Sequence, residues 1–523
     1  MNSNLTTAGI ITFLIYILCT LGIGIWSSRK GRSTKRDYFL AGDKLPWWMI
    51  GGSIMAANIS SHQIVGVMGV AYSRGVVAIV IEWGAILIGF NALLWIFLPF
   101  YIRNGFYTVP EYLQKRFGDS AKAAYLVLVL ITYVFVEIGA VLYLGALSLH
   151  SLLDVPILTS VILIAVLTGV YTILGGLRAV VWTEMLQLCI LVLGMISLTF
   201  VTINSAGGVA SIFETSKDWK LFLPASDPDF PWTMYLGGLL CISVFYNATN
   251  QFIVQRALAA KNEWHARMGV IFGNYLKFVL PILIIAPALV AAKLFPGLDK
   301  PDLVFPVLVK ELLPASLVGI VMAALVSAVM SHISGAINSS TTIITMDIYL
   351  PYIRKNASES ESVRFGRIAG ILVIVLGVLS TILLIRFSDK PIFLHLLNAY
   401  GLFTPGVATM FLMGILWKRT TNAGAMTAAV LSVPLSFIIE AWFPGMSFLN
   451  RTGIVFWVCV VICGFVSVCT KPKPTQELEG LIWDRKSVSL PVELSRYNRG
   501  VRNPMIWWAL ITLIILFFYI KYA

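Results

Sequence analysis

Charged residues are scarce in this chain of 523 residues, since Asp, Glu, Lys and Arg together make up 12% of it. Soluble proteins carry about 25%, so a water-soluble enzyme of this length would lack the charge to cover its surface. Hydrophobic residues make up 58%, and the mean hydropathy is +0.86. The same composition excludes a disordered chain, a collagen and a disulfide-rich scaffold. The chain is therefore a polytopic membrane protein.

Several signatures of chemistry are also missing. The six Cys residues show neither metal-ligand nor secreted-framework spacing. The five His residues form no H-x-x-x-H or H-E-x-x-H pattern, and no G-x-S-x-G occurs. Residues 8–26 lack the basic flank and cleavage site of a signal peptide. The missing Cys and His patterns and the missing G-x-S-x-G argue against an intramembrane enzyme. The lack of a selectivity-filter repeat argues against a channel. Residues 8–26 are expected to remain as the first helix.

Apolar runs long enough to cross a bilayer recur along the chain. A membrane-spanning helix needs about 20 mostly apolar residues. The sequence predicts an all-α membrane protein with about fourteen such helices, at 8–26, 47–72, 76–102, 123–149, 156–174, 179–203, 233–255, 268–295, 311–345, 366–386, 392–416, 423–443, 452–470 and 505–521.

The basic residues predict the orientation of these helices. The chain has no soluble domain of useful size that could carry the net charge of +13 as a basic patch, so this charge does not indicate nucleic-acid binding. If the N-terminus lies outside, 27 of the 38 Lys and Arg fall on the cytoplasmic side, ten fall opposite, and Lys277 lies within a span. Cytoplasmic loops carry such an excess. Both termini are therefore predicted to be extracellular or periplasmic.

Ionisable residues inside predicted spans are the first candidate site. Glu82, Glu137, Glu184 and Lys277 all lie there. A charge at membrane depth costs about 3 to more than 10 kcal/mol, so it faces a partner or a wet cavity. Glu82 and Lys277 could form a structural ion pair between helices, or part of a hydrogen-bonding shell around a polar solute.

Two predicted spans are interrupted by polar residues, at 56–63 and 243–251. Such clusters free backbone carbonyls in mid-membrane, which is tolerated where they line a cavity. Interrupted helices in matching positions of two halves indicate a transporter site at the midplane, although two ordinary kinked helices are the alternative. The ninth run adds polar residues between 327 and 342, whose hydroxyls could back-bond to their own helix or face the freed carbonyls as cation ligands.

Motifs spread over residues 37–419 resemble those of one family, the sodium/solute symporter family, and in particular its sodium/glucose (sodium/galactose) cotransporter branch. The matching stretches are Asp37–Gly42, Ala56–Ser60, Val109–Leu113, Lys115–Gly118, Gly175–Glu184, Gln255–Arg256, Asn338–Ser339, Thr345–Tyr349 and Leu416–Arg419.

The resemblance implies a five-plus-five inverted-repeat core built from helices 2–6 and 7–11. The corresponding division is an N-terminal helix and linker (1–46), the first repeat (47–205), an extracellular loop (206–232), the second repeat (233–443), and peripheral C-terminal helices (444–523) that include a cytoplasmic loop (471–504).

The same resemblance assigns a solute-binding shell. The sugar-binding positions of the branch fall on Gln63, Glu82, Tyr246 and Lys277, with Tyr246 also acting as the inner gate. Three positions depart from the galactose-binding pattern, because Ala85 and Ser243 replace a serine and an asparagine, and a glutamine position falls on Leu397 beside Asn398. Asn398 and Ser243 complete the predicted shell.

The family's sodium site maps onto the backbone carbonyls of Ala56, Ile59 and Ala328 and the hydroxyl of Ser331. Its second hydroxyl position holds His332. Imidazole is a poor ligand for a hard cation and can take up a proton near neutral pH. Three readings stay open: a sodium site with Ser331 alone, proton coupling through His332, or an uncoupled carrier. Glu184 falls on the family's cytoplasmic cation exit path.

The expected function is therefore cation-coupled symport of a sugar such as glucose or galactose by alternating access, in the inner membrane of a bacterium. Sodium is the expected coupling ion, with no organic cofactor and no nucleic-acid partner. A proton-coupled or uncoupled carrier, a sugar-gated sensor on the same scaffold, and another polyol or small organic solute are the alternatives.

Overall fold

The protein is built from helices throughout the part that the computed structural model describes, namely residues 6–29, 34–215, 219–387 and 392–523, with side chains left aside at 153, 214–215, 387 and 392–399. Within these residues, extended pairing is limited to the isolated bridges Leu45–Ala260 and Leu223–Pro231. The all-α class is confirmed. Ten helical stretches are long and apolar enough to cross a membrane, and two shorter apolar helices lie at 238–249 and 400–416.

The first half of the chain runs from α1 to α10. Its elements are α1 (Thr7–Arg29), α2 (Lys35–Leu40), η1 (Ala41–Asp43), α3 (Trp47–Asn58), η2 (His62–Val67), α4 (Met68–Arg74), η3 (Gly75–Ile79), α5 (Val80–Ala85), η4 (Ile86–Phe90), η5 (Leu93–Phe97), α6 (Leu98–Arg103), α7 (Val109–Arg116), α8 (Asp119–Thr132), η6 (Tyr133–Ala140), α9 (Val141–Leu153) and α10 (Ile157–Ser205).

A kink inside α10 joins two predicted spans. The runs 156–174 and 179–203 form one helical element that bends at Gly176, where φ is 59°. A side chain at this position would be strained by the left-handed backbone and would collide with the Tyr38 carbonyl. Glycine therefore allows the chain to turn while α2 packs closely against the bend.

The second half runs from α11 to α21. Its elements are α11 (Ala210–Thr215), η7 (Trp232–Leu236), α12 (Gly238–Val244), η8 (Phe245–Thr249), α13 (Gln251–Leu258), α14 (Glu263–Leu294), η9 (Pro301–Leu303), α15 (Val304–Leu312), α16 (Ala315–Ile343), η10 (Ile344–Ile353), α17 (Glu359–Phe387), α18 (Ile392–Leu416), α19 (Asn422–Trp442), α20 (Phe448–Cys469), η11 (Thr475–Leu478), η12 (Arg485–Val488), η13 (Val492–Asn498), η14 (Gly500–Arg502) and α21 (Pro504–Lys521).

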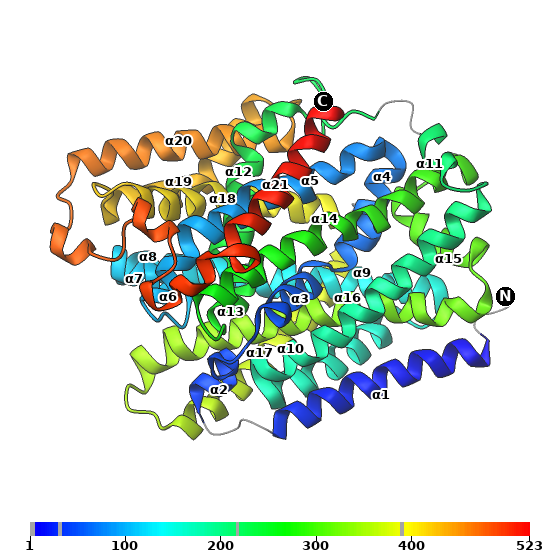
Figure 1. Cartoon of the computed structure of the whole chain (residues 1–523), viewed down its shortest axis with the longest axis horizontal. Coiled ribbons are helices and arrows are strands. Elements are labelled where there is room, and N and C mark those ends of the chain that lie inside the picture. The colour runs from blue at the N-terminus through cyan, green and yellow to red at the C-terminus, as the bar shows by residue number, and fades with distance from the viewer. Residues whose placement is uncertain (1–5, 30–33, 216–218, 388–391) are drawn as a thin grey trace.

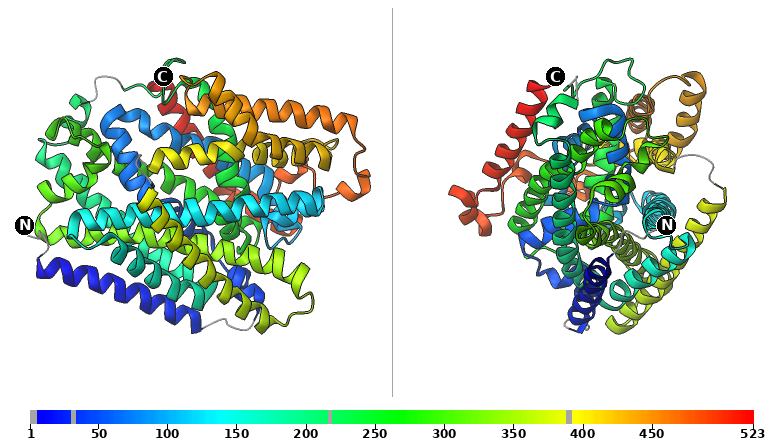
Figure 2. Two further views of the ribbon diagram at one scale, coloured as in Figure 1. Left: turned by 180° about the vertical axis from the view of Figure 1, so that it is seen from behind. Right: turned by 90° about the vertical axis from the view of Figure 1, so that its right-hand side faces the viewer.

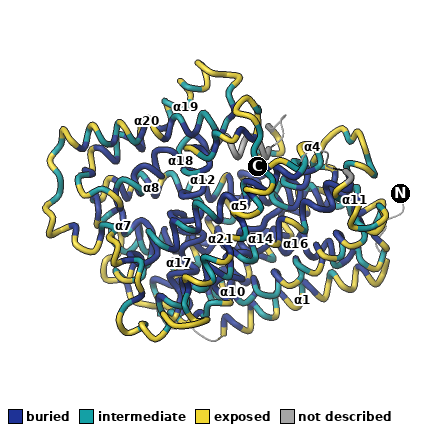
Figure 3. Tube along the Cα trace, turned by 45° about the horizontal axis from the view of Figure 1, so that its top comes forward, coloured by how far each residue is buried: buried dark blue, intermediate teal, exposed yellow. Residues whose placement is uncertain are grey.

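The helices divide into an interior group and a lipid-facing group. In an 18-residue apolar stretch of the span 315–353, 83% of the residues are buried within the protein, whereas in the corresponding stretches of α1 and α21 the share is 22%. Helix α1 packs along α10 and α16 at one edge, and α19 and α20 pack together at the opposite edge (Figure 1; Figure 2 shows the same arrangement from two further sides). Buried residues concentrate in the middle of the bundle (Figure 3). Apolar residues exposed on the outer helices suit contact with lipid.

One carboxyl group outside the spans is held at an unusual pKa. Glu111 lies on α7, between the spans 62–103 and 119–152. Burial and the negative charge of Asp347 raise the pKa of Glu111 from 4.5 to about 7, against opposing contributions from the Tyr107 amide, Lys122 and Lys115. The folded protein therefore holds the proton of Glu111 more tightly than the unfolded chain does.

This raised pKa predicts a pH-dependent contribution to stability. Ionising Glu111 costs folding free energy, so stability falls as the pH rises from about 4.5 to about 7 and is level above that, by at most about 3 kcal/mol. Glu111→Gln should remove this slope. Thermal unfolding in detergent at a series of pH values, compared between wild type and variant, measures it, and parallel curves for the two proteins would contradict the assignment.

Candidate functional site

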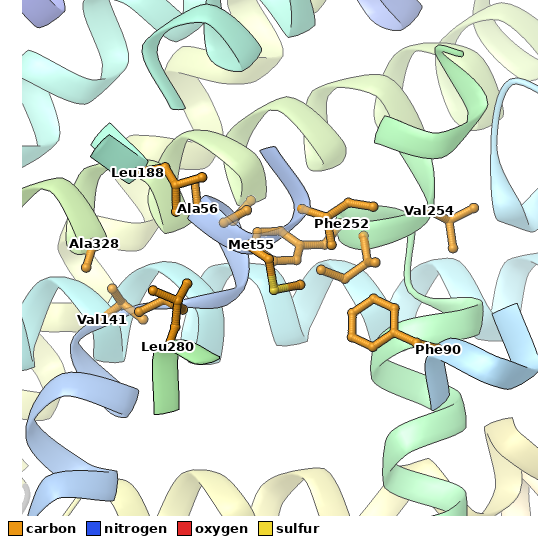
Figure 4. Close-up of a cluster of buried hydrophobic side chains, with 14 of the residues drawn as sticks. Met55, Ala56, Phe90, Val141, Leu188, Phe252, Val254, Leu280 and Ala328 are labelled. Atoms are coloured by element: carbon orange, nitrogen blue, oxygen red, sulfur yellow. The ribbon is translucent and has the colours of Figure 1, made fainter. Parts of the chain in front are cut away.

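Helix α3 is interrupted in the middle of the bundle. It ends at Asn58, Ile59 is extended (φ −89°, ψ 111°), and helical structure resumes at His62. The polar residues of this stretch compete for backbone hydrogen bonds and so favour a break. Ala56 and Ala328 belong to a cluster of buried apolar side chains that surrounds the break (Figure 4). The carbonyls at the end of α3 are therefore free of helical partners in an environment that excludes water.

A hydroxyl of α16 faces these freed carbonyls. Ser331 Oγ lies 2.7 Å from the Ala56 carbonyl oxygen and 3.1 Å from the Ala328 carbonyl oxygen. Ser331 is 1% exposed and Ala56 is 1% exposed. The structure thus brings three of the predicted cation ligands together, and Ile59 contributes the extended turn beside them. Such a group of oxygen atoms has the chemistry that a hard alkali cation requires.

His332 does not share the carbonyl that Ser331 contacts. Its Nδ1 lies 2.8 Å from the carbonyl oxygen of Ala57, and its Nε2 lies 2.6 Å from Oε2 of Glu137. Both ring nitrogens are therefore engaged by other groups. In this arrangement His332 contributes no lone pair to the oxygen cluster around Ser331.

A second break lies between η8 and α13, and its carbonyls have different hydrogen-bond partners. Asn250 is extended (φ −90°, ψ 122°), as Ile59 is in the first break. Here, however, the carbonyls of Ala248 and Thr249 accept hydrogen bonds from the hydroxyls of Tyr101, at 3.3 Å, and Tyr125, at 2.6 Å. At the first break, in contrast, the Ala56 carbonyl faces the serine hydroxyl that the sequence predicts as a cation ligand, so the oxygen cluster of the predicted cation site lies at the first break.

A cavity lies beside the first break. Its wall is formed by side chains from both halves of the chain, which are Asn58, Ser60, His62, Gln63, Ile81, Glu82, Ala85, Val136, Glu137, Leu239, Ile242, Ser243, Tyr246, Asn247, Lys277, His332 and Tyr400. The cavity includes five of the six residues predicted to bind solute. Asn398, the sixth, lies outside the described side chains.

Two charged residues form one side of this cavity. Lys277 Nζ on α14 lies 2.5 Å from Glu82 Oε2 on α5 and 2.6 Å from Asn58 Oδ1 at the end of α3. The Lys277 and Glu82 side chains are 6% and 9% exposed. The ammonium group is therefore anchored to the residue that ends the first half of the broken helix. A solute bound here would form hydrogen bonds with Lys277, whose position also depends on the end of α3 through its contact with Asn58.

The remaining predicted solute residues line the cavity in different ways. Gln63 Oε1 accepts hydrogen bonds from the amide and the hydroxyl of Ser60, both at 2.9 Å. The Tyr246 ring lies next to the rings of Phe252 and Tyr400, with centroids 6.3 Å away in each case. Ser243 is buried on α12. The wall therefore combines an amide, hydroxyls and an aromatic face, which suits a solute rich in hydroxyl groups.

Several cavity residues had no solute-binding role predicted from the sequence. Asn58, Glu137 and Tyr400 all reach the cavity, and Tyr400 donates its hydroxyl hydrogen to Glu137 Oε1. Glu137 carried a sequence signal, because it is an acidic residue inside a predicted span. Its partners His332 and Tyr400 lie 195 and 263 residues away, so nothing local in the sequence indicated the pairing.

Glu184 lies apart from the cavity. It is fully buried on α10, where Arg256 Nη2 of α13 approaches its Oε1 to 2.5 Å and the Ser53 hydroxyl donates to its Oε2. In this conformation the predicted exit-path carboxylate faces a guanidinium group rather than an open path. The ion pair links α3, α10 and α13.

The geometry around Ser331 makes a prediction for cation binding. Ser331→Ala removes one of the oxygen ligands while leaving the carbonyls, so the apparent sodium affinity should fall by roughly 10- to 100-fold. Sodium titration of solute uptake measures this effect. Thr341→Val is a matched control, because the Thr341 hydroxyl only donates to the Ile337 carbonyl of its own helix. Equal sodium dependence in wild type and Ser331→Ala would exclude Ser331 as a ligand.

Comparison with known sequences finds relatives along most of the chain. A family model described as the sodium:solute symporter family matches residues 38–432. A sodium/glucose cotransporter of Vibrio parahaemolyticus is 33% identical in an alignment of 497 positions that covers 88% of this chain and 90% of that protein. A sodium/myo-inositol cotransporter 2 of Sus scrofa is 33% identical in an alignment of 533 positions that covers 91% of this chain and 78% of that protein.

Solved structures share the fold. A sodium-coupled sialic acid symporter in a substrate-bound, outward-open state has a TM-score of 0.78 at 21% identity, covering 89% of this chain and 99% of that chain. A nucleobase-cation-symport-1 family transporter in a closed conformation has a TM-score of 0.56 at 13% identity, covering 86% and 98%. These likenesses show that the chain shares the fold of the two solved structures.

Proposed function

Because this chain belongs to the sodium:solute symporter family, we propose that it is a secondary active transporter that couples sodium entry to the uptake of a sugar or a related polyol. One observation carries this proposal. The break in α3 serves both sites, since Ala56 faces Ser331 on one side and Asn58 contacts Lys277 in the cavity on the other. A cation and a solute that each order the same break must influence each other's binding.

The chemistry of the cavity wall supports this solute class. Lys277 and Glu82 neutralise each other, so the cavity suits a neutral solute that donates and accepts hydrogen bonds. Tyr246 offers a ring face on which the apolar face of a pyranose can stack. A cyclic polyol meets these requirements as well, and both sodium/glucose and sodium/myo-inositol cotransporters are among the similar proteins. Glucose and galactose are the first hexoses to test, and myo-inositol is the matched polyol.

We propose the following sequence of steps for transport. Sodium binds to the Ala56, Ile59 and Ala328 carbonyls and the Ser331 hydroxyl, which holds the two parts of the broken helix in one arrangement. Solute then binds in the cavity through Gln63, Glu82, Ser243 and Lys277. By linkage, solute must raise sodium affinity by the factor with which sodium raises solute affinity. Closure of the outer side, with movement of Tyr246 and passage of sodium by Glu184, then releases both inward.

The repeat architecture is part of this proposal. We infer fourteen membrane-spanning helices, with both termini on the outer side of the membrane. The second to sixth spans (47–205) form the first inverted repeat, and the seventh to eleventh spans (233–443) form the second. Extended residues at Ile59 and Asn250, in the first helix of each repeat, support this assignment. Interrupted helices in matching positions are a mark of such transporters.

Uptake into proteoliposomes tests the proposal. Radiolabelled D-glucose, D-galactose and myo-inositol are offered with sodium and proton gradients imposed separately. Accumulation driven by sodium is the expected result. Accumulation driven by the proton gradient alone would replace sodium by a proton as the coupling ion. Binding of a solute without accumulation under either gradient would overturn active transport in favour of a facilitator or a sensor.

A further inference from the structure

A chain of hydrogen bonds crosses the protein from the break in α3 to the far wall of the cavity. It begins at the Ala57 carbonyl, continues through His332 on α16 and Glu137 on η6, and ends at the hydroxyl of Tyr400 on α18. The residues come from four separate elements. His332 and Glu137 are 1% and 3% exposed, so both are shielded from bulk solvent although they contribute to the cavity wall.

The hydrogen atoms in this chain can be counted. The Ala57 oxygen only accepts, so Nδ1 of His332 carries a hydrogen. The 2.6 Å separation of Nε2 from Glu137 Oε2 requires a second hydrogen between those atoms, and the Tyr400 hydroxyl supplies the third to Oε1. The histidine and the carboxylate together are then neutral overall. A buried pair of this kind adds no net charge beside a cation site.

The two ends of the chain lie at the two proposed sites. At one end, Ala57 is the residue between the Ala56 carbonyl, which faces Ser331, and Asn58, which contacts Lys277. At the other end, the Tyr400 ring lies 6.3 Å from the Tyr246 ring in an edge-to-face arrangement. The Phe252 ring, 4.9 Å from His332, also contacts Tyr246. Displacement of the Ala57 peptide therefore reaches the aromatic wall of the cavity through directional bonds.

We propose that His332, Glu137 and Tyr400 form a relay that transmits the ordering of the α3 break by the cation to the aromatic wall of the solute cavity. The inference rests on the proposed function and identifies three positioning residues for it. His332 then acts through Glu137 and not as a cation ligand. His332 stands at the position where a hydroxyl ligand was expected, and in this chain the Glu137 carboxylate lies within hydrogen-bonding distance of its ring.

The test compares variants that break the hydrogen-bonded chain with a variant that keeps the chain but removes the charge of Glu137. Glu137→Ala interrupts the chain, and Tyr400→Phe removes its last bond while keeping the ring. Glu137→Gln keeps the connection without charge, because the variant amide can donate to Nε2 of a neutral His332 and accept from Tyr400. Ser380→Ala is the control, since the Ser380 hydroxyl donates to the Val134 carbonyl near Glu137 but lies outside the chain.

The measured quantity is the affinity of purified protein for D-glucose, D-galactose and myo-inositol, with and without sodium. Coupled sites change each other's affinity by roughly 5- to 150-fold. Glu137→Ala and Tyr400→Phe should lose this enhancement, whereas Glu137→Gln and Ser380→Ala should keep it. Binding of radioactive sodium without solute should be unchanged in Tyr400→Phe, which separates lost transmission from a lost cation site.

Two outcomes would overturn the relay in distinguishable ways. Sodium enhancement that persists in both Glu137→Ala and Tyr400→Phe refutes the relay and leaves symport intact. If sodium does not change the affinity of the wild-type protein for whichever of the three solutes it binds, the relay and sodium coupling are both refuted. Equal loss of enhancement in Ser380→Ala would trace the effect to general packing around Glu137 and also refute the relay.

Discussion

Replacing Lys277 by alanine is expected to abolish measurable solute binding while the protein still inserts into the membrane. The substitution removes the ammonium donor and leaves Glu82, 9% exposed, without its ion-pair partner. Truncating one partner of a buried hydrogen-bonded charge pair costs about 2–5 kcal/mol or more, so the affinity should fall by roughly 30-fold or more. Asn58 also loses its contact at 2.6 Å, which loosens the end of α3. Binding of radiolabelled solute to purified protein measures the loss, and Glu82→Ala should behave alike.

A matched variant separates recognition from stability. Lys122 and Asp347 form another buried ion pair, 2.9 Å apart and 2% and 0% exposed, outside the cavity wall. Lys122→Ala should therefore destabilise the protein by a similar mechanism without changing solute affinity. Unchanged solute affinity in Lys277→Ala, or an equal loss in Lys122→Ala, would remove Lys277 from the binding site.

Much of the architecture was accessible from the sequence because lipid imposes simple rules. Apolar runs of about 20 residues predict helices, and polar clusters inside them predict interruptions. The breaks at Ile59 and Asn250 lie within the two polar stretches singled out for this reason. The cost of an isolated charge in the membrane likewise predicted partners for Glu82 and Lys277. Their partnership with Asn58 was not predicted, since an amide leaves no comparable energetic signal.

Tertiary pairings over long separations were harder to predict. His332 was identified as a departure at the predicted cation site, but its orientation depends on Glu137, which lies 195 residues away. Arg256 directly follows the predicted span 233–255 and is one of the 27 basic residues assigned to the cytoplasmic side, yet it is 1% exposed and packed against Glu184. Hydropathy averages over a window, and such an average does not distinguish a basic residue that faces water from one that a neighbouring helix neutralises.

Arg256 is expected to give the largest loss of stability. Its Nε donates to the Ser53 hydroxyl at 2.9 Å, its Nη2 lies 2.5 Å from Glu184, and its guanidinium lies over the Phe252 ring at 5.3 Å. Arg256→Leu would leave Glu184 as an unpaired buried charge. Breaking a buried ion pair in this way costs about 3–5 kcal/mol. Thermal unfolding in detergent should show a much lower midpoint.

The double variant decides whether the charge itself is the cause. Replacing buried ion pairs by apolar residues of similar volume is often neutral or stabilising, so Arg256→Leu combined with Glu184→Leu should recover much of the stability that either single substitution loses. A double-mutant cycle measures the coupling between the two side chains. Strictly additive losses would show that the pair does not hold α10 to α13. Recovery of stability without recovery of sodium-driven uptake would instead place the Arg256–Glu184 pair in the transport cycle, because the double variant restores packing but neither charged group.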